Sequence, residues 1–130
     1  MDKKYLAQII ATDNEGLQTI SALVSGGKVS VSEIKYLSSN QVFLLSIERN
    51  KIETNEDHKK INSICRFNFV EKVKSKNIDQ KNEELVLDLI AIDYLKNKDD
   101  YEIILIFDKN AHIALTAETI GVNLEDQNEI

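Results

Sequence analysis

The chain has 130 residues, of which 42% are hydrophobic and 29% charged, values typical of a folded globular domain and not of a disordered chain. No run of apolar residues approaches the roughly 18 needed to cross a bilayer, and the first residues lack a signal-peptide pattern. The single cysteine, Cys65, excludes an internal disulfide and favours a reducing compartment. We therefore expect one cytoplasmic domain over residues 1–130 with no membrane partner.

The net charge of −6 and the pI of about 4.9 make nucleic acid an unlikely partner, because the phosphate backbone attracts basic surfaces. The charge is unevenly spread along the chain. Residues 1–48 carry 4 basic and 5 acidic side chains. Residues 49–81 carry 9 basic and 5 acidic side chains, whereas residues 82–130 carry 3 basic and 12 acidic ones. The middle segment is therefore the candidate contact for an anionic partner.

The first two predicted elements are a short strand over 6–11 and a helix near 14–25. Asp13 can cap the helix, and its apolar residues recur at helical intervals. The pair Gly26-Gly27 supplies the positive φ with which many helices end.

Alternating apolar residues then predict strands. Within 29–36 the apolar residues change from odd-numbered to even-numbered positions. One regular strand would place these two sets on opposite faces, so we predict a bulge or break near Ser32-Glu33. Further strands are expected over 42–47 and 61–73, with a polar loop at 50–59 between them.

Three strands over 85–95, 101–107 and 112–120 are expected to form an antiparallel meander, because short turns join antiparallel neighbours. Residues 125–130 are expected to fray. The chain thus predicts an α+β fold, mainly antiparallel β, with about seven strands and one principal helix. Apolar residues on both faces of several strands imply a curled sheet, a sandwich or a half-barrel.

No stretch carries a catalytic or phosphate-binding motif, and we expect no cofactor. His58, Cys65 and His112 are isolated from one another, which gives no metal-ligand spacing. Cys65 alternates with Phe67 and Phe69, so we interpret it as a core residue and not as a nucleophile.

Two sets of residues are candidates for a site. The first is a basic partner surface of Arg66, Lys72, Lys74 and Lys76, whose even spacing would place them on one side of an extended chain. A solvated row of lysines that protects a strand edge is the alternative. The second is a pocket formed where the sheet curls, with Asp13, Asp88 and His112 as the residues to inspect.

Four stretches resemble a family of alphaproteobacterial proteins, the domain of unknown function 2948. They are residues 11–22 (ATDNEGLQTISA), 66–73 (RFNFVEKV), 89–92 (LIAI) and 117–126 (AETIGVNLED). The resemblance spans nearly the whole chain and implies a bacterial cytoplasmic domain. It implies no substrate and no functional residue.

The sequence therefore leaves the function open. The leading hypothesis is a non-enzymatic binding or protein-interaction domain, whose partner could be another protein or a second copy. One alternative is a small-ligand-binding protein or small enzyme with a pocket in the curled sheet. Another is weak association with RNA or the ribosome through residues 66–76.

Overall fold

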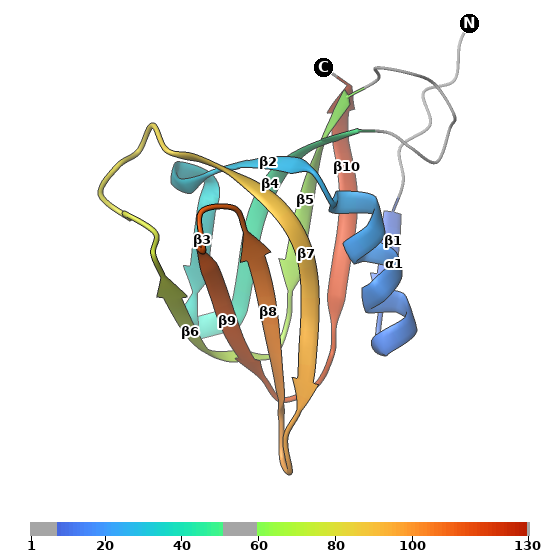
Figure 1. Ribbon diagram of the computed structural model, residues 1–130. Helices are drawn as coiled ribbons and strands as arrows, with labels where there is room; N and C mark the ends of the chain where they lie inside the picture. The colour runs from blue at the N-terminus through green and yellow to red at the C-terminus, as the bar shows by residue number, and fades with distance from the viewer. Residues whose placement is uncertain (1–7, 51–59, 130) are drawn as a thin grey trace, which may run out of the picture.

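The computed structural model describes residues 8–50 and 60–129, which form one ten-stranded antiparallel sheet and one α-helix (Figure 1). The helix α1 spans Asn14–Val24. The strands are β1 Gln8–Ala11, β2 Gly27–Ser30, β3 Ile34–Leu37, β4 Val42–Asn50, β5 Lys60–Phe67, β6 Val70–Lys76, β7 Val86–Lys96, β8 Tyr101–Phe107, β9 His112–Ala117 and β10 Val122–Glu129. Two 3-10 turns, η1 Val31–Glu33 and η2 Ser38–Asn40, flank β3.

The helix begins and ends as the sequence predicts. The Asp13 carboxylate accepts a hydrogen bond from the Gly16 amide at 2.8 Å, which satisfies one of the unpaired N–H groups of the first turn. Gly26 follows the helix with φ +84°, a conformation that costs glycine little. Leu17, Ile20 and Val24 lie on the buried face, which packs mainly on β7 and β1.

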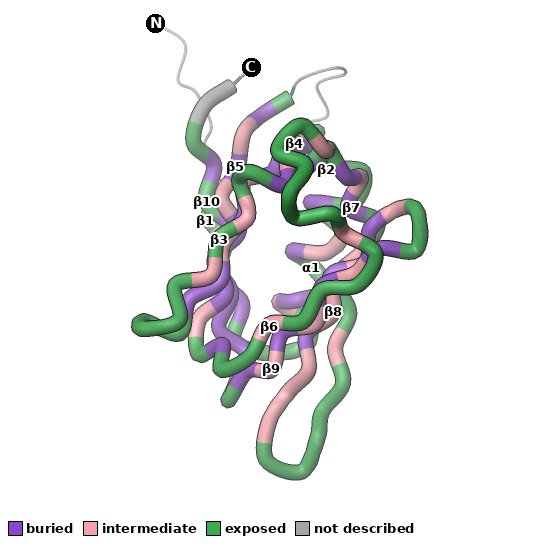
Figure 2. Tube along the Cα trace, turned by 90° about the vertical axis from the view of Figure 1, so that its left-hand side faces the viewer, coloured by how far each residue is buried: buried purple, intermediate pink, exposed green. Residues whose placement is uncertain are grey.

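The sheet follows the order β1-β10-β5-β4-β2-β7-β8-β9-β6. The strand β2 pairs with the C-terminal part of β4, and β3 pairs with its N-terminal part. The sheet curls, so that its two halves face each other across a shared core (Figures 1 and 2). Phe43 and Phe67 from one half and Phe107 from the other belong to the same buried cluster. The prediction of a mainly antiparallel, curled sheet with one principal helix is confirmed, and β7, β8 and β9 form the expected meander.

The prediction of about seven strands is wrong, because three features raise the number to ten. The break expected near Ser32-Glu33 is the 3-10 turn that separates β2 from β3. The single strand expected over 61–73 is divided at Phe69, whose φ of 62° turns the chain. Phe69 is therefore 46% exposed instead of sharing the buried face of Cys65.

The third feature is β10. The prediction of a frayed end is wrong for residues 125–129, which belong to a strand paired with β5, and in part with β1. Residue 130 and the polar loop expected at 50–59, apart from Asn50, lie outside the described residues.

A buried polar cluster joins β10 to β4 and β5. The Arg49 guanidinium donates to both carboxylate oxygens of Asp126, at 2.9 and 3.1 Å, and both side chains are fully buried. Ser63 Oγ donates to Asp126 at 2.6 Å and accepts from Arg49 Nε at 3.0 Å. The register of three strands is therefore fixed by a hydrogen-bonded ion pair inside the fold.

Candidate functional site

The outer face of β6, β9, β8 and β7 is the surface on which the predicted lysines lie. Directly paired residues of antiparallel strands project their side chains to the same side of a sheet. The pairing of the four strands therefore arranges the outward side chains in three rows. From β6 to β7 the rows are Lys76-His112-Ile106-Ala91, Lys74-Ala114-Ile104-Asp93 and Lys72-Thr116-Glu102-Leu95.

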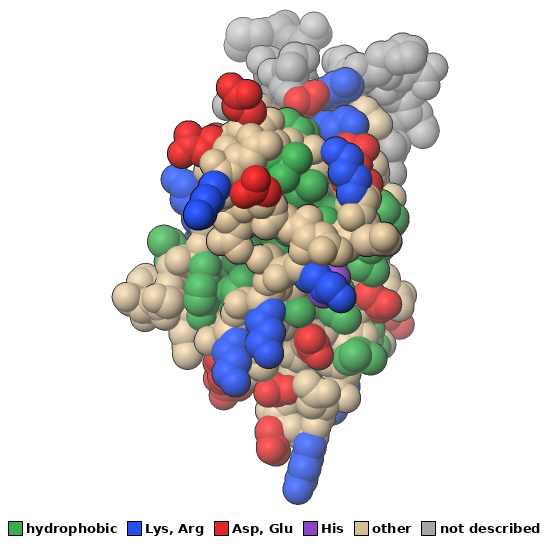
Figure 3. All heavy atoms as spheres, turned by 60° about the vertical axis from the view of Figure 1, so that its left-hand side comes forward, with side chains coloured by type: hydrophobic (Ala, Val, Ile, Leu, Met, Phe, Trp, Pro, Cys, Tyr) green, Lys and Arg blue, Asp and Glu red, His purple; other side chains and the backbone are tan. Residues whose placement is uncertain are grey.

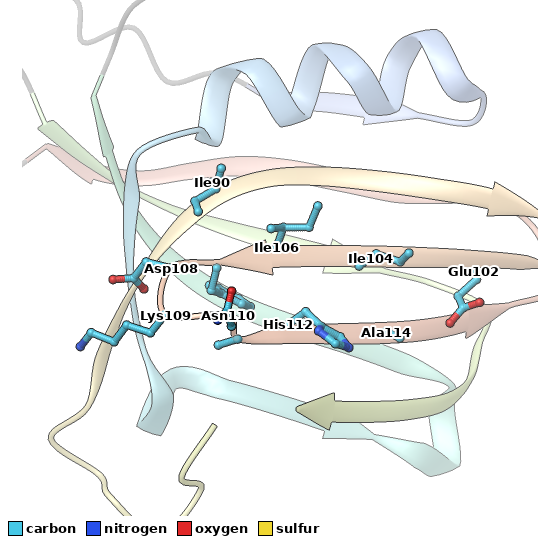
Figure 4. A pocket seen from close by; sticks show the side chains of 11 residues that line it. Ile90, Glu102, Ile104, Ile106, Asp108, Lys109, Asn110, His112 and Ala114 are labelled. Atoms are coloured by element: carbon cyan, nitrogen blue, oxygen red, sulfur yellow. The ribbon is translucent and has the colours of Figure 1, made fainter. Parts of the chain in front are cut away.

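The centre of this face is a hollow of about 530 Å³ (Figure 4). Ile104 and Ile106 of β8 form its floor together with Ala114 of β9, while Ile90 projects from β7. Ile90 is 51% exposed because it is the bulged residue between the paired positions Leu89 and Ala91. The hollow is thus mainly apolar, and it is open to solvent.

Charged and polar groups surround the hollow. His112 lies at the edge toward β6, and Asp108, Lys109 and Asn110 come from the turn between β8 and β9 (Figure 4). Lys109 and Asn110 both have positive φ, at 60° and 58°, which makes this turn tight. The turn places a mixed set of charges at one end of the apolar floor.

The lysines of β6 lie on the strand next to the β9 edge of the hollow. Lys72, Lys74 and Lys76 are exposed, and they alternate with Val73 and Ser75, which point to the opposite side of the strand. In Figure 3, where the β6 side of the molecule comes forward, basic and hydrophobic side chains lie next to one another. Glu102 and Asp93 lie toward the other side, so the face has a basic flank, an apolar centre and a partly acidic flank.

Arg66 is not part of this face. It lies on β5, where its paired neighbours are Asn123 of β10 and Leu44 of β4. This is the outer side of the opposite half of the curled sheet. The structure therefore brings Lys72, Lys74 and Lys76 together and separates Arg66 from them.

The three residues expected to share a pocket also lie apart. Asp13 caps α1 and lines a separate hollow with Tyr94, Lys96 and Tyr101. Asp88 lies beside β2, where it forms a hydrogen-bonded ion pair with Lys28 and thereby raises the pKa of that lysine. His112 alone of the three lines the hollow on the outer face.

Cys65 is a buried core residue, as interpreted from its spacing. Burial raises the pKa of its thiol, because the thiolate would lose its hydration inside the core. A protonated, inaccessible thiol is a poor nucleophile. Catalysis by Cys65 has no geometric support in this fold.

We expect Cys65 to resist a thiol reagent such as dithionitrobenzoate in the folded protein and to react completely in concentrated guanidinium chloride. The raised pKa also sets the sign of a pH effect. The unfolded thiol ionises first, so its contribution to stability is present at neutral pH and is lost as pH rises above about 9. Urea unfolding at pH 8 and pH 10 should show a fall in the free energy of unfolding that is smaller in Cys65→Ala. Rapid labelling of the native protein would contradict this account.

Within residues 8–50 and 60–129, no three His, Cys, Asp or Glu side chains gather closely enough to hold a metal ion. The one α-helix of that part of the chain is too short to cross a membrane.

The family model for the protein of unknown function DUF2948 matches residues 7–130. The chain belongs to this family. No curated protein matches the DUF2948 chain. Among solved structures, an uncharacterised protein from Neisseria gonorrhoeae is similar at 16% identity and a TM-score of 0.47, over 92% of this chain and 97% of that one.

Two of the stretches that resemble the DUF2948 family meet at the end of the sheet where β5 turns into β6. Asn68 donates from its amide and from its side chain to the Gly121 carbonyl, at 2.8 and 3.1 Å, and also to Asn123. The Glu118 amide donates to the Phe69 carbonyl at 3.0 Å. These residues hold the two halves of the curled sheet together, which is a structural role and not a chemical one.

Proposed function

We propose that this domain binds an acidic, amphipathic segment of another protein on the outer face of β6, β9, β8 and β7. The observation that carries the proposal is the mainly apolar hollow of about 530 Å³, whose lining residues Ala114 and His112 are paired with Lys74 and Lys76 on the neighbouring strand β6. An exposed apolar depression with a polar border is typical of protein-interaction sites. The free thiol of Cys65 supports the expectation that this happens in a reducing compartment such as the cytoplasm.

The partner's chemistry follows from the two parts of the face. Ile104, Ile106 and Ile90 offer apolar surface, which gains free energy when it is removed from water. The lysines of β6 attract carboxylates, which raises the association rate and sets the orientation of the segment. A segment with apolar residues on one side and acidic residues beside them satisfies both requirements.

A protein partner fits this face better than RNA does. The three rows of outward side chains contain no Phe, Tyr or Trp on which a base could stack. Glu102, Asp93 and Asp108 would also repel phosphates from the same face. The lysines therefore act as a flank for an apolar contact and not as a track for a nucleic-acid backbone.

The proposal is tested with a fluorescein-labelled peptide of alternating glutamate and aliphatic residues, measured by fluorescence anisotropy. Reversal of three exposed charges, each worth about 0.2–1 kcal/mol, should weaken binding about tenfold or more in K72E/K74E/K76E. Ile104→Glu should also weaken it, by placing a carboxylate on the apolar floor. The wild-type dissociation constant should rise with salt.

The matched control is K35E/R66E/K81E, which changes the net charge equally at exposed positions away from the three rows. It should bind the acidic peptide nearly as well as the wild type. Equal loss in both triple variants would show a general charge effect and would overturn the proposed face. Tighter binding of the same peptide with lysine in place of glutamate would overturn the choice of partner.

A further inference from the structure

A second cavity lies at the open side of the curled sheet, between β3 and β6. β3 pairs with β4, β6 pairs with β9, and the described residues show no strand pairing between β3 and β6. At one end the two strands are held together. There Tyr36 Oη donates to the Val70 carbonyl at 2.9 Å, and the Val70 amide donates to Gln41 at 2.8 Å. Beyond this point a slit opens between them.

The slit leads into a cavity of about 350 Å³, within the usual size range of small-molecule sites. Phe43 and Ile113 at its base are almost fully buried, while Val73 and Ile78 on its wall are half-buried. The complete lining is Val31, Ile34, Tyr36, Phe43, Val73, Ser75, Ile78, Gln80 and Ile113. Protein interiors contain few voids larger than a water molecule, so an apolar cavity of this size within the fold is a feature to explain.

The polar groups of the lining are few and uncharged. None of its nine residues is Asp, Glu, Lys, Arg or His. Gln80 Nε2 donates to Ser75 Oγ at 2.7 Å, and both residues are exposed. The Ser75 oxygen is the acceptor in this bond, so the Ser75 hydroxyl can still donate a hydrogen bond to a ligand. The side-chain carbonyl of Gln80 can accept a hydrogen bond from the same ligand.

We propose that this slit binds a neutral, mostly apolar small molecule that presents one hydroxyl, carbonyl or amide group to Ser75 and Gln80. The apolar lining favours a ligand that is mainly hydrocarbon. A charged group would lose its hydration here without a counter-ion in the lining, which is costly. The site lies on the inner side of β6, and it is independent of the protein-binding face on the outer side.

The experiment uses 1-aminoanthracene, a neutral amine whose fluorescence increases in apolar surroundings. Wild-type protein should bind it saturably, and 1-octanol should displace it. Ser75→Trp places a large side chain in the slit and should weaken binding at least tenfold. Lys74→Trp adds the same side chain to the outer side of the same strand and should bind the dye as the wild type does.

Ile78→Asp is a second variant, placed in the segment after β6 and outside any strand pairing, and it should also weaken binding. Thermal unfolding of all three variants checks that each is folded. Absence of saturable binding to the wild type, or equal loss in Ser75→Trp and Lys74→Trp, would overturn the site. Displacement by octanoate as effectively as by 1-octanol would overturn the neutral ligand. Loss of acidic-peptide binding in K72E/K74E/K76E is a separate readout, so either proposal can fail alone.

Discussion

Replacing Asp126 with alanine is expected to lower the free energy of unfolding by about 3–5 kcal/mol. The Asp126 carboxylate accepts hydrogen bonds from Arg49 and Ser63, and both charged side chains are fully buried. Removal of the carboxylate takes two acceptor oxygens and the negative charge beside them away from a fully buried guanidinium. Breaking one side of a buried ion pair costs more than the net stability that the intact pair supplies.

Urea unfolding followed by circular dichroism measures this change. The control is Glu48→Ala, which removes the carboxylate of the exposed Lys60–Glu48 pair at 3.7 Å and should cost less than about 1 kcal/mol. The double variant Arg49→Met/Asp126→Leu should be more stable than Asp126→Ala, because it removes both charges of the buried pair together and replaces them with apolar side chains. A loss below about 1 kcal/mol for Asp126→Ala would contradict the role given to this cluster.

Gly27→Ala is expected to destabilise the fold by about 1–3 kcal/mol, because it adds a methyl group where there is no space. A Cβ at this position would lie 2.5 Å from Ile47 Cγ2 and 2.9 Å from the Val24 carbonyl oxygen. Ile47 is fully buried and Val24 belongs to the last turn of α1. Neither can move without disturbing the packing of the helix against β4.

Gly121→Ala is the matched control for this substitution. Its Cβ would lie 2.8 Å from the ring of Phe69, which is 46% exposed and can rotate toward solvent. The expected loss is therefore smaller than that of Gly27→Ala, as judged by thermal and urea unfolding. Equal or reversed losses would show that the close approach of α1 and β4 at Gly27 is not a tight constraint.

Local sequence signals predicted the local structure well. Asp13, the helical spacing of Leu17 and Ile20, and Gly26 together define α1, because caps and amphipathic spacing act within a few residues. The change of apolar parity near Ser32 likewise marks the end of β2. The strand β10 was missed because its support is distant in sequence: it comes from pairing with β1 and β5 and from the buried Asp126.

The candidate face was predictable only in part. Alternation along β6 correctly placed Lys72, Lys74 and Lys76 on one side of the strand. It could not separate Arg66 from them, because the positive φ of Phe69 reverses the chain between β5 and β6. The apolar hollow was not predicted, because apolar residues on both faces of a strand do not show which face another layer covers. The outer face of Ile104 and Ile106 is open to solvent.

The most direct test of the proposed protein-binding face is a backbone-amide NMR titration of the full chain with the acidic, amphipathic peptide. Shift changes should concentrate on β6, β8, β9 and the turn at Asp108–Asn110, with little change on β5 and β10. Saturating changes on β5 and β10 around Arg66 and Asn123, with β6, β8 and β9 unaffected, would contradict the proposed face.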